Sequence, residues 1–305
     1  MRNTGLSCFQ DFQCLAGSCP DTCCAGWEID LDRESLEVYA QVTGALGREL
    51  KEHIRREDGY TFFALKDGRC PFLNSRGLCR LILDLGEGCL STTCREHPRF
   101  VEEYGELRET CLSISCPEAA RLLLEEPLEL ITCQTPEQAP EEDRPDGAYL
   151  QELLDYRQEL LAFAASGAPL EDMLRAVGET VGPVRWDLPG FWRALEQMEF
   201  TSDRLPKRLK ETVPLWDREQ WDHPSELGSR LLWYFLYRYV LRAVWDGLLR
   251  EKVLLSVYSV ATILTLAGGE EKEAVQEAAS LYSREVEHSD ENLDLLYSAL
   301  EGNSL

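Results

Sequence analysis

Apolar residues return every three or four positions between residues 32 and 57. Leu36, Tyr39, Leu46, Leu50 and Ile54 share one face at helical spacing, and charged residues fill the positions between them. The pattern predicts an amphipathic helix over 32–57 whose apolar face packs on the rest of the protein.

The next stretch changes from helical spacing to short apolar runs bounded by turn residues. Residues 60–65 precede the turn pair Asp67 and Gly68, and the segment CPFLNSRGLC follows from Cys70 to Cys79. Such punctuation predicts short strands joined by tight turns. Further on, Pro117 occupies a first helical position, so Cys116 stands at a helix N-terminus, where the helix dipole favours a thiolate.

Helical spacing dominates the second half of the chain. Residues 135–147 contain three prolines and a run of acids and predict a linker. Helices are predicted over 148–166, 170–178, 189–200, 226–250, 251–267 and 270–301, the last broken near His288. We therefore expect a mainly α fold. A cysteine-rich metal or cluster domain, residues 1–135, with short β-hairpin elements should pack on an all-helical domain, residues 136–305.

The segment from Ser229 to Leu249 is apolar enough to suggest a membrane helix. Arg238, Arg242 and Asp246 interrupt it at four-residue intervals, which argues against a membrane span. A buried core helix is expected instead. Its charged stripe either forms internal ion pairs or contacts a polar ligand.

A second polar pattern lies between Tyr282 and Leu296. Glu285, His288 and Asn292 fall on one face if the helix continues through them. The face is either functional or an ordinary polar surface, and a helix break capped at Ser289 is a third interpretation.

All twelve cysteines lie between Cys8 and Cys133. The chain starts with Met1, Arg2 and Asn3 and leads into polar sequence without an apolar signal segment. We therefore expect a cytoplasmic protein in a reducing compartment, where thiols remain available to a metal.

The cysteines divide into two sets by their surroundings. Cys8, Cys89, Cys111 and Cys133 stand among ordinary apolar neighbours, and the other eight stand beside Gly, Pro or turn residues. These eight are the predicted metal ligands: Cys14, Cys19, Cys23, Cys24, Cys70, Cys79, Cys94 and Cys116. Four thiolates satisfy one zinc ion or one four-iron cluster. Spacing leaves open which metal binds and whether there are one or two sites.

The formal net charge of −24 argues against a nucleic-acid partner, because phosphate binding needs clustered Lys and Arg. Most of this charge serves a solvated surface. An acidic surface also suits a cationic partner.

Four cysteine motifs carry a resemblance. FQCLAGSCPDTCCAGW (12–27), CPFLNSRGLC (70–79), TCREHPR (93–99) and SCPEAAR (115–121) resemble, in this order, the flagellin lysine-N-methylase (FliB) family. YFLYRYVLRAVWDG (234–247) and YSREVEHSDENLDLL (282–296) do so less specifically. The resemblance implies a cytoplasmic enzyme that methylates surface lysines of flagellin. It also implies S-adenosylmethionine as donor and a 4Fe-4S cluster on the motif cysteines.

Methyl transfer to lysine requires removal of a proton, because the ammonium form has no lone pair. His288 is the predicted base, with Glu285 as its orienting partner and the hydroxyls of Tyr237 and Tyr234 as substitutes. The usual glycine-rich donor loop is missing. We therefore predict that Arg238, Arg242 and Asp246 line a cofactor site facing the cluster, between the two halves.

Two other classes of function remain open. A non-enzymatic zinc or iron–sulfur scaffold would need only the cysteine-rich part of the chain. An electron-transfer protein would need the cluster but no substrate site.

Overall fold

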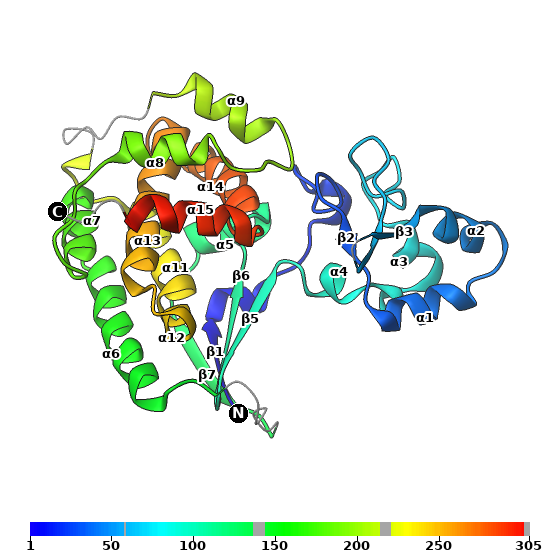
Figure 1. Ribbon diagram of the computed structural model, residues 1–305, viewed down its shortest axis with the longest axis horizontal. Coiled ribbons are helices and arrows are strands. Elements are labelled where there is room, and N and C mark those ends of the chain that lie inside the picture. The colour runs from blue at the N-terminus through cyan, green and yellow to red at the C-terminus, as the bar shows by residue number, and fades with distance from the viewer. Residues whose placement is uncertain (58, 137–143, 214–220, 302–305) are drawn as a thin grey trace.

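In the computed structural model, which describes residues 1–57, 59–136, 144–213 and 221–301, helix α13 (Leu249–Ala267) is the centre of a helical body (Figure 1). Its sequence is apolar almost all round, as expected of a helix buried on every side. Among the described residues, the helices that pack most closely against it are α7 (Leu170–Glu179), α8 (Leu188–Leu195), α11 (Glu226–Tyr239), α14 (Lys272–Val286) and α15 (Asp290–Glu301).

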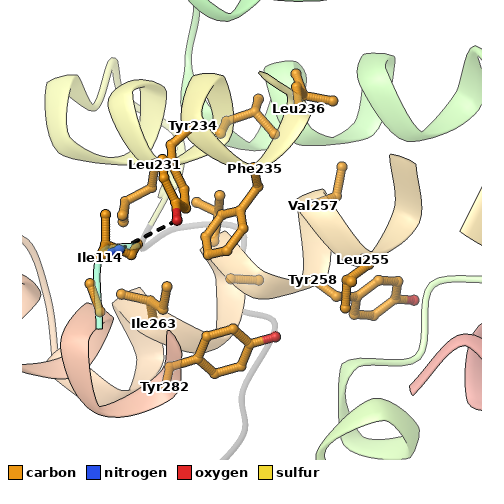
Figure 2. Close-up of a cluster of buried hydrophobic side chains, with 14 of the residues drawn as sticks. Ile114, Leu231, Tyr234, Phe235, Leu236, Leu255, Val257, Tyr258, Ile263 and Tyr282 are labelled. Atoms are coloured by element: carbon orange, nitrogen blue, oxygen red, sulfur yellow. Dashed lines mark hydrogen bonds between the residues drawn. The ribbon is translucent and has the colours of Figure 1, made fainter. Parts of the chain in front are cut away.

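Side chains from three of these helices interdigitate in the core (Figure 2). Phe235 of α11 and Tyr282 of α14 meet edge to face at 6.2 Å between ring centroids. The backbone N–H of Ile114 donates to the hydroxyl of Tyr234 at 3.4 Å, so the segment after β6 is anchored to α11. The outer helices of the body are α6 (Gly147–Ala164) and α9 (Arg204–Glu211).

A four-stranded sheet with the order β5-β6-β1-β7 completes the helical body. Its strands are β1 (Arg2–Leu6), β5 (Arg99–Tyr104), β6 (Leu107–Leu112) and β7 (Leu130–Gln134). β1 runs parallel to β6, and the other pairs are antiparallel. Helix α5 (Pro117–Glu125) follows β6 and packs on α11 and α14.

A second lobe lies beside this body and contains most of the cysteine motifs (Figure 1). Its small sheet has the order β2-β4-β3. The elements are β2 (Ile29–Asp30), α1 (Arg33–Gln41), α2 (Gly44–His53), β3 (Ile54–Glu57), β4 (Tyr60–Phe63), α3 (Arg80–Leu85) and α4 (Thr92–Glu96). Leu50, Phe63 and Phe72 are at the centre of its separate hydrophobic cluster. The chain enters the lobe through residues 12–28 and leaves it at His97.

The prediction of one helix over 32–57 is wrong. Two helices, α1 and α2, and the strand β3 occupy this range. Gly44 has φ +74°, which interrupts a helix, and Ile54 pairs with Phe63 of β4. The apolar spacing survives because α1, α2 and β3 all face the same small core.

The prediction of one helix over 226–250 is also wrong. α11 ends at Tyr239, a 3-10 turn covers Val240–Arg242, and the short α12 spans Ala243–Asp246. Gly247, with φ +74°, ends α12. Leu241 and Ala243 pack with Tyr104 and Leu107 of the large sheet, a contact that a straight helix would not make.

The mainly helical class is confirmed, as are helices close to 148–166, 170–178 and 251–267 and the break near His288. Pro117 begins α5 as predicted. The predicted helix over 189–200 is shorter, and the sequence reading missed α9 and the large sheet. Between Cys70 and Cys79 the chain forms turns and one isolated bridge in place of strands.

Residues of the first 135 contribute to the cores of both lobes, and the domain boundary at 135 stays a prediction. The centre of the predicted linker, residues 137–143, lies outside the described residues. No helix in the described ranges has the length and apolar character needed to cross a membrane.

Candidate functional site

His288 lies at the junction of α14 and α15, where the two lobes meet. Its Nε2 is 3.0 Å from the Ser113 Oγ and 2.9 Å from the Ser115 Oγ. Both serines belong to the segment that Tyr234 anchors through Ile114. The imidazole orientation is therefore set by two hydroxyls on a buried segment.

Three aromatic rings surround this imidazole. Ring centroids lie 5.3 Å away at Trp27, 5.2 Å away at Phe100 and 5.9 Å away at His97. Trp27 and His97 stand where the chain enters and leaves the cysteine-rich lobe, so the rings come from both lobes. Trp27, His97, Phe100, Arg284 and His288 are called the interlobe site below.

Both histidines of the interlobe site are held neutral. His288 is exposed and His97 is half-buried. Desolvation by the surrounding protein, followed by His97, Arg238 and Arg284, lowers the pKa of His288 to about 3. Desolvation and Arg284 lower the pKa of His97 to about 4. Neither ring carries a proton charge at neutral pH, so both can accept hydrogen bonds.

Arg284 joins the two lobes. Its guanidinium lies 3.1 Å from an Asp21 carboxylate oxygen and 4.4 Å from the centre of the Trp27 ring. It also donates to the carbonyl oxygens of Thr22 and Ala25. The loop that carries Cys23 and Cys24 is thereby fixed against α14.

Glu285 does not orient His288. Its carboxylate accepts hydrogen bonds from the Thr201 N–H at 2.7 Å and the Thr201 hydroxyl at 2.9 Å. Asn292 donates to the carbonyl oxygens of Glu285 and Glu199, both at 2.8 Å. These two residues connect α14 and α15 to the segment after α8, and Ser113 and Ser115 take the orienting role predicted for Glu285.

Arg238 belongs to a buried charge network behind Phe100. Its guanidinium lies 2.7 Å from a Glu102 oxygen, 4.0 Å from a Glu287 oxygen and 3.9 Å from the Phe100 ring centre. The Tyr234 hydroxyl donates to Glu287 at 2.9 Å. Burial raises the pKa of Glu287, and Arg238 opposes this rise. The internal ion pair weighed for the charged stripe is thus present at Arg238.

The other predicted site residues lie in different environments. Arg242 is 3.8 Å from Glu102, so it shares the partner of Arg238. Asp246 binds Lys252 at 2.5 Å. The Tyr237 hydroxyl donates to the carbonyl oxygen of Thr4 at 3.3 Å, and its ring packs under Arg157. The break after Tyr239 separates the stripe that continuous helical spacing had joined.

Four of the predicted ligand cysteines form an inner thiol group, Cys24, Cys70, Cys79 and Cys94, at the edge of the smaller core. Burial raises the pKa of Cys70 to about 12, and negative charge on Cys24, Cys94 and Cys79 adds to this. Burial likewise raises the pKa of Cys94 to about 11. The Cys70 N–H donates to the Cys24 carbonyl oxygen at 2.8 Å.

The other four predicted ligands, Cys14, Cys19, Cys23 and Cys116, form an outer thiol group. Burial raises the pKa of Cys116, and negative charge on Cys19 and Cys14 raises it further. A hydrogen bond with Cys23 lowers the pKa of Cys24 to about 7, so this pair connects the two groups. Cys116 precedes α5, which brings the helical body into the group.

The donor set fits a thiophilic metal, because thiolates are the preferred ligands of zinc and iron–sulfur clusters. Within the described ranges, no three Cys, His, Asp or Glu side chains converge on a single metal position. The thiols of each group therefore lie near one another, but they do not point at one common metal position. Cys8, Cys89 and Cys111 are packed in the two cores, and Cys133 is exposed on β7.

Sequence reasoning missed most of the interlobe site. Trp27 and His97 were seen only as parts of cysteine motifs, and Ser113 and Phe100 carried no signal. Arg284 had one available signal, since it precedes His288 by four residues in the segment predicted as a helix broken near His288.

The cysteine-motif loops, the helical body and His288 between them place the chain in the class of two-lobed proteins with cysteine motifs. The chain is 32% identical to Lysine-N-methylase of Salmonella choleraesuis (strain SC-B67) over 123 residues, which are 38% of this chain. Identity is also 32% to Lysine-N-methylase of Salmonella typhimurium and 31% to the flagellar biosynthetic protein FliU of Salmonella muenchen.

The chain belongs to the lysine-N-methylase (FliB) family. The matched region covers 73% of FliU but only 31% of each Lysine-N-methylase. No family model and no solved structure matches the chain.

Proposed function

We propose that the protein is a protein lysine N-methyltransferase that modifies surface lysines of flagellin with S-adenosylmethionine as donor. Family membership is the observation that supports this reaction, because the matched relatives are named for lysine methylation and for flagellar biosynthesis. The interlobe site supports it, because neutral imidazoles and aromatic rings are accessible there beside the cysteine loops.

We also propose that the two thiol groups hold a 4Fe-4S cluster, with zinc as the alternative metal. Eight grouped cysteines provide enough thiolates for two four-ligand sites. Binding would draw each group together, since the thiols already lie near one another. If only three thiolates of a group held the cluster, the remaining iron would be free to bind the amino and carboxylate groups of the donor.

This chain's own residues would bind and orient the reactants. Arg238 is the best placed of the three predicted cofactor residues, because it contacts Phe100 of the interlobe site. Arg242 supports it through Glu102. His288 is a weak base at its lowered pKa, so it serves as a fixed wall and hydrogen-bonding group of the site.

The direct test is methyl transfer by anaerobically purified, full-length protein. Flagellin incubated with methyl-labelled S-adenosylmethionine should gain label on lysine, measured by peptide mass spectrometry. Flagellin without the protein is the control. Absence of lysine methylation with metal-loaded protein would contradict the proposal.

The alternative is a non-enzymatic zinc or iron–sulfur module, a scaffold or an electron carrier. The eight grouped thiols alone favour it. Metal-loaded protein that binds neither donor nor flagellin would support this alternative.

A further inference from the structure

We propose that the interlobe site receives the ε-amino group of the substrate lysine as the neutral amine, and that His97 accepts a hydrogen bond from it. This inference rests on the proposed methyltransferase function and names the residues that would hold its nucleophile. His97 was not among the residues predicted from the sequence.

The His97 imidazole is available to a ligand. Within the part of the chain that the structure describes, neither ring nitrogen has a hydrogen-bond partner in the protein. Its ring is held 6.1 Å from Trp27 and 5.9 Å from His288, measured between centroids. A half-buried, neutral ring with two unpartnered nitrogens is well suited to accept a hydrogen bond from a ligand.

The surrounding rings suit the methylene stem of lysine. Trp27 and Phe100 present apolar ring surface beside His288, with centroids 5.3 and 5.2 Å from its ring, and both are half-buried. Long side chains of lysine commonly lay their apolar stem along such surface while the amine finds a polar partner.

Positive charge next to these rings disfavours an ammonium. Arg284 stacks over Trp27 and Arg238 over Phe100, at 4.4 and 3.9 Å from the ring centres. Both side chains are at least nine-tenths buried, with 7% and 6% exposure, and the Nε of each has no hydrogen-bond partner in the described structure. The same two guanidinium groups help to keep His288 unprotonated. An amine that enters this environment is pushed toward its neutral form.

Other charged groups near the site limit this effect. Asp21 faces Arg284, and Glu102 and Glu287 face Arg238. Cys24 and Cys19 lie within the electrostatic reach of Arg284. These carboxylates pair with the guanidinium groups. The two imidazoles contribute no charge, so they offer neutral hydrogen-bond acceptors to a ligand.

The proton balance is simple. The lysine ammonium releases one proton to solvent as it enters the site. The neutral amine that results donates an N–H hydrogen bond to His97. The lone pair of this amine attacks the methyl group of the sulfonium donor, forming the N–C bond and breaking the S–C bond. The donor leaves as a neutral thioether, and the positive charge moves to the methylated nitrogen. The guanidinium groups then disfavour this cation, which helps the product to leave.

Binding can be tested without methyl transfer, because the chain has only four histidines. Full-length protein labelled with 15N-histidine is titrated with Nα-acetyl-lysine methylamide, and the imidazole signals are followed by NMR. Nα-acetyl-norleucine methylamide, which keeps the four-carbon stem but lacks the amine, is the matched probe. The imidazole signal that is missing from the His97→Asn variant belongs to His97.

We expect the lysine probe to shift the His97 signal, more strongly at pH 9 than at pH 7, with the norleucine probe giving a smaller shift. His53 on α2 provides an internal reference. Equal shifts with both probes, or no shift of His97, would overturn the proposal. A His97 shift without any methyl transfer would leave amine binding intact and reject the methyltransferase function.

Kinetics provide the second test. His97→Phe, which keeps a ring but removes both nitrogens, should lower kcat/KM for methyl transfer by about 10-fold, the effect of one lost positioned hydrogen bond, with unchanged metal content. His53→Gln is the control. Arg284→Met should move the pH profile of kcat/KM to higher pH, and Arg284→Lys should restore it. An unchanged profile in the Met variant, or equal shifts in both variants, would contradict the role of positive charge.

Discussion

His97 and His288 make the stability of the folded protein depend on pH. Their pKa values fall from the ordinary 6.5 to about 4 and about 3, chiefly through desolvation. Between these values and 6.5 the unfolded chain binds more protons than the folded protein. The free energy of unfolding should therefore decrease as pH falls from about 6.5 toward 4.

Urea unfolding of the full chain at pH 6.5, 5.5 and 4.5 measures this dependence. The double variant His97→Asn, His288→Asn should show a shallower loss of stability over the same range. His53→Gln provides the comparison, and equal slopes in all three proteins would show that other groups control the pH dependence.

Asp246 is expected to act on stability. Its carboxylate binds Lys252 at 2.5 Å, and the lysine side chain is only 1% exposed. Asp246→Asn leaves this buried ammonium without its counter-charge. Because Asp246 itself is 43% exposed, water compensates in part, and we expect a loss of about 1–2 kcal/mol. Thermal unfolding should show a lower Tm with an unchanged visible spectrum.

Helix α14 shows how one element serves both lobes. Arg284 lies in the last turn of α14, and His288 follows two residues after the helix ends. Arg284 holds the cysteine loop, and His288 enters the ring cluster with Trp27. The position of the loop relative to the interlobe site therefore depends on this helix end.

Asp21→Ala tests this connection. Asp21 pairs with Arg284 at 3.1 Å and with Arg204 at 2.7 Å, so its removal breaks both ion pairs at once. Backbone amides of residues 12–28 should exchange with deuterium faster, measured by mass spectrometry. Glu37→Ala, which removes a surface pair with Arg33, should leave this exchange unchanged. Equal protection from exchange in both variants would show that the ion pairs of Asp21 do not hold this loop.

For the molecule as a whole, the proposed role of the two thiol groups predicts its metal content. Anaerobic protein should be brown and hold about four irons per chain for one cluster. Cys19→Ser, Cys23→Ser and Cys24→Ser should each lose colour and iron, because a hydroxyl replaces a stronger thiolate ligand. Iron, sulfide and zinc analysis measures the outcome.

Cys133→Ala is the matched control, since Cys133 is exposed on β7 outside both thiol groups. Its metal content should equal that of the original protein. Colourless protein with stoichiometric zinc would contradict the cluster and favour the zinc alternative.

The formal net charge of −24 fits a lysine-bearing partner, which the methyl-transfer assay tests directly.

The sequence determined the parts of this protein that depend on local pattern. Apolar spacing located α6, α7 and α13, Pro117 marked the start of α5, and the cysteine motifs identified the family. Turn residues around Cys70 and Cys79 separated the grouped thiols from Cys8 and Cys111, which are packed in a core. Each of these features is set by near neighbours in the chain.

Only the tertiary structure decided what the distant segments do together. Ile54 joins a strand because Phe63 pairs with it, and the charged stripe breaks because Leu241 packs under the large sheet. The interlobe site brings together Trp27, His97 and His288, which are separated by 70 to 261 positions. Helical and strand periods describe single elements, so no spacing rule can bring such residues together. Packing of the two lobes does so, through Arg284 and the serines that hold His288.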